Sequence, residues 1–140
     1  MIWNILLWGF VIGIIHFVIV GVLYGNPFIG KIYKDAQDHP GVKKWPSQAS
    51  YMIKMFLGTQ IEVYIMTAAY FIIRGFFSEP FSLQTAAILA ALFCGIRVYP
   101  RFWNMWIQST YPNKLLLIEA VNGTIGTFII VLGLYLFPVI

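Results

Sequence analysis

Four ionisable side chains fall inside long apolar stretches of this chain, and each therefore demands a physical reason. They are His16, Glu62, Arg97 and Glu119. A charged group at the centre of a membrane-spanning helix costs about 2.5–3.5 kcal/mol on insertion scales, so such groups are kept for pairing or for function. Together with Asn122, three residues after Glu119, they form the candidate polar intramembrane site.

His16 and Glu62 lie near the midpoints of two apolar stretches and could face each other at a similar depth. A His–Glu pair in lipid can relay protons, bind a cation or act in acid–base chemistry. The alternative is a neutral, buried histidine that is hydrogen-bonded to a carboxyl group. Two ligands alone do not make a metal site, and Thr59, Gln60 and Asn122 would add oxygen ligands only if packing brings them near. We therefore predict no metal site.

Arg97 and Glu119 are expected in the inner third of the bilayer, because each lies near the same end of its apolar stretch. A pair between them would neutralise two costly charges through directional hydrogen bonds. It would be either a static clamp between helices or part of an ion or lipid head-group site. Four neighbouring residues are the candidate head-group contacts: Arg101, Lys114, Trp103 and Trp106.

The composition identifies the solvent of these stretches as lipid. The chain has 140 residues, of which 60% are hydrophobic and only 10% are charged. Soluble domains are about a quarter charged, and a core of this size could not hide so much apolar surface. The net charge is +4, but the basic residues cluster at the ends of apolar stretches. This distribution indicates membrane topology, and we predict no nucleic-acid partner.

No sequence motif points to a reaction. The chain has no Gly-rich phosphate loop, nucleophile elbow or His-Glu-x-x-His pattern. Its one cysteine, Cys94, excludes an internal disulfide and a cysteine metal cluster. We therefore predict no catalytic residue and no cofactor.

The apolar stretches predict an all-α membrane protein, a four-transmembrane-helix bundle that forms one domain over residues 1–140. A span needs about 20 mostly apolar residues. Residues 25–50 are polar and rich in Pro and Gly, which is typical of a loop with one short interfacial helix. Apolarity is lost between Arg97 and Arg101, so residues 100–113 are expected to form an aromatic interfacial segment. The predicted spans are 2–24, 51–73, 82–99 and 115–137.

The basic residues predict an orientation. Eight lysines and arginines fall on the side of the loops after the first and third spans, and only Arg74 falls on the opposite side. Basic residues are enriched in cytoplasmic loops. We therefore expect two helical hairpins in the plasma membrane (the inner membrane of a bacterium), with both basic loops cytoplasmic and both termini on the non-cytoplasmic side.

Small residues predict where the helices approach each other. Helices in lipid associate through close packing at small residues, since lipid supplies no hydrophobic drive between them. Three stripes are expected to point inward: Gly9 and Gly13; Ala87, Ala91 and Gly95; and Asn122, Gly123, Gly126 and Gly133.

Two segments carry a resemblance to a known family. The first runs from Gly21 through Tyr24, Pro27 and Phe28 to Gly30-Lys31 and Tyr33, and the second runs from Pro112-Asn113-Lys114 to Asn122. The chain resembles an uncharacterised family of small bacterial four-helix integral membrane proteins, a domain of unknown function. It has Leu23 and Tyr33 where that family favours tryptophan. The resemblance implies a four-helix bundle and carries no established activity.

Three functions are consistent with these features. The first is a homo-oligomeric transporter or channel for an ion, a proton or a small polar solute, with Glu62 and His16 in its path. The second is an accessory or assembly subunit of a larger membrane complex. The third is an enzyme that binds a lipid or quinone head group near Arg97 and Glu119. The expected partners are the lipid bilayer and further copies of the chain or a larger complex.

Overall fold

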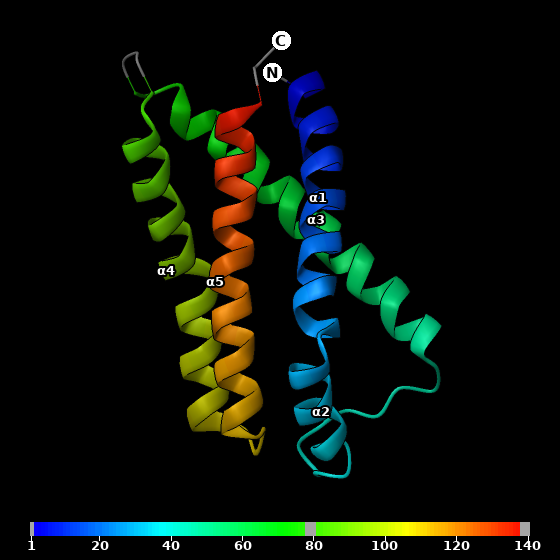
Figure 1. The fold of residues 1–140 in the computed structure, drawn as a ribbon. Helices are drawn as coiled ribbons and strands as arrows, with labels where there is room; N and C mark the ends of the chain where they lie inside the picture. The colour runs from blue at the N-terminus through cyan, green and yellow to red at the C-terminus, as the bar shows by residue number, and fades with distance from the viewer. Residues whose placement is uncertain (1, 78–80, 138–140) are drawn as a thin grey trace.

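The computed structural model describes residues 2–77 and 81–137, and within these ranges it contains helices and no strand. Figure 1 shows the arrangement. All helices except the second are long and apolar enough to cross a membrane. The prediction of an all-α chain with four long apolar helices is confirmed. The helices are α1 (Ile2–Gly25), α2 (Pro27–Asp35), α3 (Gln48–Arg74), α4 (Leu83–Gln108) and α5 (Asn113–Leu136).

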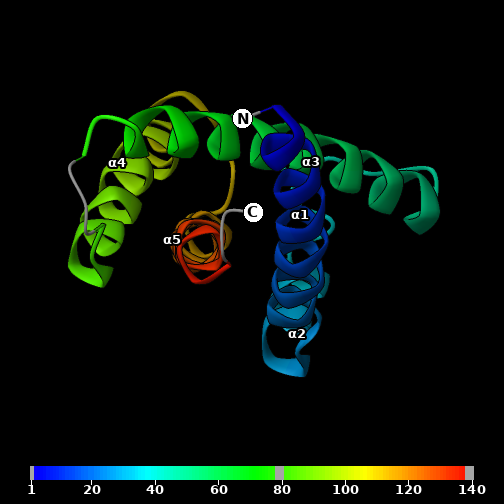
Figure 2. The same cartoon turned by 90° about the horizontal axis from the view of Figure 1, so that it is seen from above.

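The long helices pack as two pairs. α1 packs mainly on α3, α4 packs mainly on α5, and the contact between α1 and α5 joins the pairs. Seen from above, α3 crosses behind α1 toward the start of α4 (Figure 2). Over the residues described, the backbones of α3 and α4 do not come close to each other. Any direct link between these two helices must therefore come from long side chains.

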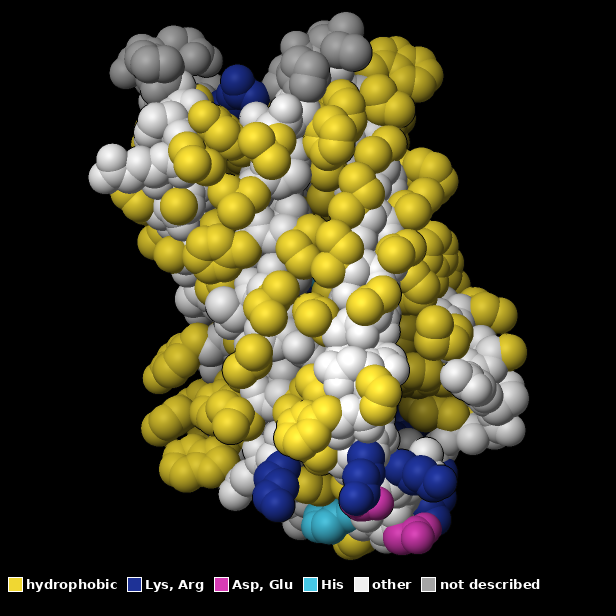
Figure 3. All heavy atoms as spheres, in the orientation of Figure 1, with side chains coloured by type: hydrophobic (Ala, Val, Ile, Leu, Met, Phe, Trp, Pro, Cys, Tyr) yellow, Lys and Arg dark blue, Asp and Glu magenta, His cyan; other side chains and the backbone are white. Residues whose placement is uncertain are grey.

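The start of α1 and the end of α5 lie at the same end of the bundle (Figure 1). The rings of Trp8 and Phe137 stack there, with centroids 4.8 Å apart. The prediction for the termini concerns Met1 and residues 138–140, which lie outside the described residues. α2 and the connection between α4 and α5 lie at the opposite end, where basic side chains gather (Figure 3).

α4 does not end where the sequence led us to expect. It continues through Pro100 to Gln108, nine residues beyond the predicted end of the span at residue 99, and the interfacial position of segment 100–113 stays a prediction. A proline removes one backbone hydrogen bond, but a membrane helix tolerates it when neighbouring groups compensate. The helix ends when Ser109 donates its N–H (3.1 Å) and its hydroxyl (2.6 Å) to the carbonyl oxygen of Met105. Arg97 therefore lies in the middle of a 26-residue helix.

The segment between the first two long helices contains the short helix that the sequence suggested. The side chain of Asn26 caps α2 by accepting hydrogen bonds from the N–H groups of Phe28 and Ile29, both at 3.0 Å. Pro27 occupies the first turn, where a missing N–H has no consequence. Further along, the hydroxyl of Ser47 caps α3 by accepting from the N–H of Ser50 at 3.1 Å. Both ends of this connection are thus fixed by side-chain caps.

Glycines allow α1 to approach its neighbours, as predicted. A Cβ atom at Gly9 would lie 2.4 Å from the ring of Tyr64 on α3. On α5, a Cβ atom at Gly126 would lie 2.6 Å from the imidazole of His16. These separations are too short for a side chain, so both contacts require glycine.

The predicted stripe on the third span is wrong. Ala87, Ala91 and Gly95 are not buried, and a Cβ atom at Gly95 would meet nothing within 4 Å. The buried residues are instead Ala86, Leu89 and Ala90. One residue is about 100° of helix rotation, so small-residue spacing alone did not fix which face of α4 packs on α5.

We expect Gly9→Leu to weaken the packing of α1 on α3. The new side chain would overlap the Tyr64 ring, and overpacking typically costs about 1–3 kcal/mol. Thermal unfolding in detergent, followed by circular dichroism, should show a lower Tm. Gly21→Leu is the matched control, because a Cβ atom there meets nothing within 4 Å. Equal Tm values for the two variants would contradict the close packing at Gly9.

Candidate functional site

Arg97 joins three helices through its guanidinium group. From α4, its Nε donates to Oε1 of Glu62 on α3, and its Nη2 donates to Oε2 of the same carboxylate at 2.7 Å. Its Nη1 donates to the Gly123 carbonyl oxygen at 3.1 Å and to the Thr127 hydroxyl oxygen at 2.7 Å, both on α5. A planar guanidinium suits this two-point contact with a carboxylate. The pair thus supplies the link between α3 and α4 that their backbones lack.

The predicted pair between Arg97 and Glu119 is therefore wrong. Glu62 and Arg97 both lie at the middle of their helices, whereas Glu119 lies in the second turn of α5. The prediction placed Arg97 near a helix end because apolarity is lost between Arg97 and Arg101. The side chain of Glu62 is 39% exposed and that of Arg97 is 20% exposed. The pair is therefore only partly enclosed by the chain itself.

Glu119 has two other partners near the basic end of the bundle. Its Oε2 accepts from Nη2 of Arg101 at 2.9 Å, and its Oε1 accepts from the hydroxyl of Tyr111 in the connection before α5. The Glu119 side chain is 18% exposed and that of Arg101 is 69% exposed. Burial, and then the hydrogen bond to the Glu119 carboxylate, raise the pKa of Tyr111 above its ordinary value. Tyr111 therefore remains a neutral hydrogen-bond donor at physiological pH.

A cavity of about 60 Å³ connects the two ion pairs. One water molecule needs roughly 10–15 Å³ of such space, so the cavity has room for a few waters or a small solute group. Arg97 and Arg101, one helical turn apart on α4, both face it. The lining residues are Glu62, Arg97, Val98, Arg101, Phe102, Leu116, Glu119, Ala120 and Gly123.

His16 is buried but is not paired with Glu62. Both oxygens of Glu62 accept from Arg97, a full positive charge, which is a stronger partner than a neutral imidazole. His16 instead packs on the backbone of α5 at Gly126. Its Nδ1 has no hydrogen-bond partner among the residues described. The structure therefore places His16 in the core of the bundle, outside the cavity lining.

The structure buries two polar residues that the sequence analysis did not name, Thr67 on α3 and Thr127 on α5. Gln60, named only as a conditional oxygen ligand, is buried alongside His16 and Asn122. The buried face of α3 follows the positions 60, 63, 67 and 70, which is the helical spacing that would have revealed them. Water is the usual partner of buried polar groups that lack one in the protein.

The predicted head-group contacts separate in the structure. Arg101 lines the cavity, whereas Trp103, Trp106 and Lys114 do not. Trp103 is partly exposed on α4 and contacts two other aromatic rings, with centroids 6.1 Å from Tyr99 and 5.3 Å from Trp106. The tryptophans thus form an aromatic surface of their own. In the part of the chain that the structure describes, no three His, Cys, Asp or Glu side chains are placed to share a metal ion.

Comparisons of the chain with protein-family models, with curated proteins and with solved structures found no match. The function is therefore inferred from the chemistry and geometry of the chain itself.

We expect the Glu62–Arg97 pair to behave as one unit in a double-mutant cycle. Glu62→Gln leaves a charged guanidinium without its counter-ion and should cost about 3 kcal/mol, at the lower end for broken buried pairs because Glu62 is partly exposed. Adding Arg97→Gln should recover much of that loss. The measurement is the free energy of unfolding from an SDS titration in mixed micelles, followed by circular dichroism.

Arg101→Gln is the matched control for this cycle. It removes the same group from a pair in which the arginine side chain is 69% exposed and Glu119 keeps the Tyr111 hydroxyl as a partner, so the loss is expected to be smaller than for Glu62→Gln. Additive costs for Glu62→Gln and Arg97→Gln would show that the two side chains do not stabilise each other.

Proposed function

We propose that this chain is a multi-pass protein of the bacterial plasma membrane that acts as a homo-oligomeric transporter or channel for a proton, an ion or a small polar solute. The observation that carries this proposal is the Glu62–Arg97 ion pair at the middle of the helices, beside a cavity that extends to Arg101 and Glu119. α1, α3, α4 and α5 would be the spans. Both termini would be non-cytoplasmic and both basic loops cytoplasmic.

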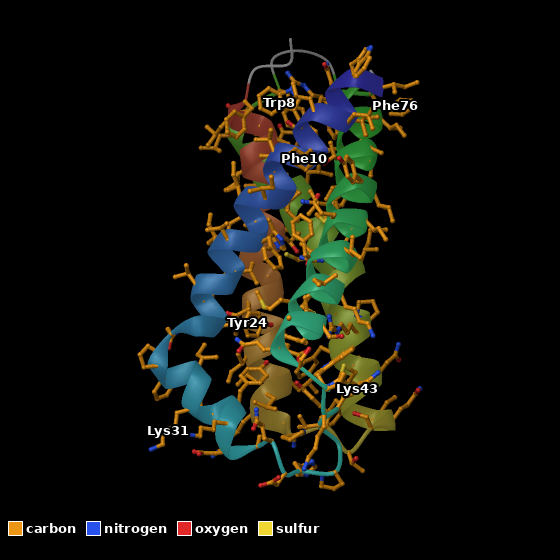
Figure 4. The ribbon with its side chains drawn as sticks, turned by 90° about the vertical axis from the view of Figure 1, so that its right-hand side faces the viewer. Trp8, Phe10, Tyr24, Lys31, Lys43 and Phe76 are labelled. Atoms are coloured by element: carbon orange, nitrogen blue, oxygen red, sulfur yellow. The ribbon has the colours of Figure 1, made fainter. Side chains whose placement is uncertain are left out.

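The distribution of side chains supports insertion. Hydrophobic side chains cover most of the height of the bundle, and a band of basic side chains lies at one end (Figure 3). The other end carries aromatic residues, among them Trp8, Phe10 and Phe76 (Figure 4). Aromatic side chains are typical of membrane interfaces, and basic ones of the cytoplasmic side.

The cost of the ion pair supports a role beyond packing. Two charges at mid-membrane are expensive even when paired, and apolar residues of similar volume often stabilise a protein equally well. Glu62 also lines the cavity, so a proton or ion that enters the cavity can reach its carboxylate. Arg97 also donates to the oxygens of Gly123 and Thr127, so a ligand that competed for the Glu62 carboxylate would leave Arg97 with two contacts on α5.

The small size of the cavity explains why we propose an oligomer. About 60 Å³ is room for a few water molecules, and the cavity joins only the two ion pairs. A path through the whole membrane would need surfaces from more than one copy, and closed symmetric oligomers are the usual way to provide them.

One observation favours a second candidate function, the binding of a lipid or quinone head group for an enzymatic step. Arg101 lines the cavity while 69% of its side chain is exposed, so an anionic head group could reach Arg101 from outside the bundle. Such a ligand would compete with Glu119 for the guanidinium. This candidate requires no flux of solute across the membrane.

We expect labelling of single cysteines to report the proposed orientation. With Cys94→Ser as background, Phe76→Cys should react with a membrane-impermeant maleimide in intact bacterial cells. Gln37→Cys, in the connection after α2, should react only after the membrane is opened. The opposite pattern would reverse the orientation, and labelling of both positions in intact cells would contradict membrane insertion.

We expect the purified protein in liposomes to carry a solute, and Glu62→Gln to abolish the flux. The panel comprises protons, alkali-metal cations, divalent cations and small anions, each followed with an internal dye. Thr124→Val is the matched control, because the Thr124 hydroxyl bonds only within its own helix, to Ala120 at 2.9 Å. Unchanged helicity and detergent elution volume of Glu62→Gln would separate lost transport from lost folding.

If the wild-type protein produced no flux of any solute in the panel, the result would contradict transport. If Glu62→Gln lost no more flux than Thr124→Val, the ion pair would have no place in the path.

A further inference from the structure

Two lysines converge on one tryptophan at the basic end of the bundle. The ammonium group of Lys43, in the connection before α3, lies 4.6 Å from the centre of the Trp45 ring. The ammonium group of Lys54, two turns into α3, lies 4.8 Å from the same centre. The Trp45 ring also packs against Tyr51, with centroids 5.9 Å apart. A loop residue and a helix residue thus present two positive charges around one aromatic side chain.

The position of this cluster is fixed by the local fold. Ser47 caps α3 immediately after Trp45 and Pro46, so the chain enters the helix in a defined direction. The Tyr51 ring rises from the first turn of that helix. The local fold therefore fixes the positions of the two lysines and the indole relative to one another at the start of α3. A ligand site needs side chains with fixed positions of this kind.

The two positive charges of the cluster lack a carboxylate. Asp38 forms an ion pair in this connection, but its partner is Lys44, at 3.1 Å. No ion pair between a carboxylate and Lys43 or Lys54 occurs among the residues described. A cation–π contact attracts each ammonium group to the ring but does not neutralise its charge. Two like charges held near one ring are stabilised by an anion placed between them.

The depth of the cluster identifies the source of that anion. After Lys54, α3 exposes apolar side chains such as Met55, Leu57 and Ile61, which would contact lipid tails. Lys54 and Trp45 would then lie at the level of the lipid phosphates, where tryptophan rings and extended lysine side chains are favoured. Basic residues near a cytoplasmic membrane surface attract anionic lipids by about 1 kcal/mol each.

We propose that Lys43, Lys54 and Trp45 form a binding site for the phosphate of an anionic phospholipid. The proposal rests on the membrane insertion proposed above and is independent of transport. The two ammonium groups bind the phosphate oxygens. The Trp45 indole lies at the membrane interface and holds both lysines through cation–π contacts. The site lies on α3 and the connection before it, so none of its residues lines the cavity.

The test measures lipid binding to the intact chain by native mass spectrometry in detergent, during titration with phosphatidylglycerol or phosphatidylcholine. We expect phosphatidylglycerol to bind more tightly, with a loss of roughly fivefold for each lysine removed in Lys43→Gln/Lys54→Gln. Lys31→Gln/Lys34→Gln is the control, since it removes the same charge from α2. Lys31 and Lys43 lie on different sides of this end of the bundle (Figure 4).

Inorganic phosphate distinguishes a lipid site from a phosphate site. A lipid site binds the acyl chains as well as the phosphate, so a large excess of inorganic phosphate should leave lipid binding unchanged. Displacement of the lipid by inorganic phosphate would overturn the proposal of a lipid site. Equal binding of the two lipids, or equal losses in the two double variants, would show unspecific surface charge and would also overturn it.

A second measurement locates the bound lipid and separates this proposal from insertion. In a variant that keeps only Trp45, with the other four tryptophans changed to Phe, brominated phosphatidylglycerol in vesicles should quench fluorescence more than brominated phosphatidylcholine. Equal quenching by both lipids would overturn the site while leaving insertion intact. No quenching by either would overturn insertion and the site together.

Discussion

The fold depends on the placement of one guanidinium group. α3 and α4 have no close backbone contact over the described residues, yet Arg97 bonds a carboxylate of α3 and two oxygens of α5. In the membrane proposed for this chain, no hydrophobic drive would hold the helices together, so a charge-assisted contact at mid-helix would have unusual weight. Because these contacts reach two neighbouring helices, Arg97 restricts the rotation of α3, α4 and α5 relative to one another.

The remaining contacts are consistent with that constraint. Glycines at positions 9 and 126 let α1 approach α3 and α5 closely. Polar side chains on these three helices, such as His16, Gln60 and Thr127, are buried between them. The bundle thus has a polar layer at its middle and another at its basic end, where Glu119 meets Arg101 and Tyr111. A cavity joins the two layers.

Hydropathy was sufficient to predict the four long helices, because spans in lipid need long apolar stretches whatever they pack against. The partners of the charges were not predictable in the same way. Arg97 was assigned to Glu119 because the loss of apolarity after Arg97 was expected to end its span. The arginine that binds Glu119 is instead Arg101, one helical turn further along α4, and Arg97 binds Glu62 on α3. The inward face of α4 was also misplaced by one residue, at Ala87 instead of Ala86. Rotation and depth are set jointly by several helices, and one sequence stretch does not contain that information.

The central claim is that Arg97 bonds Glu62 within the membrane. Solid-state NMR of the protein in lipid bilayers can measure it, with 15N in the arginine side chains and 13C in the glutamate carboxyl groups. We expect strong dipolar coupling between the Arg97 guanidinium nitrogens and the Glu62 carboxyl carbon, and its loss in Glu62→Gln. Coupling of Arg97 to Glu119 instead, or no coupling to either carboxyl group, would contradict the account.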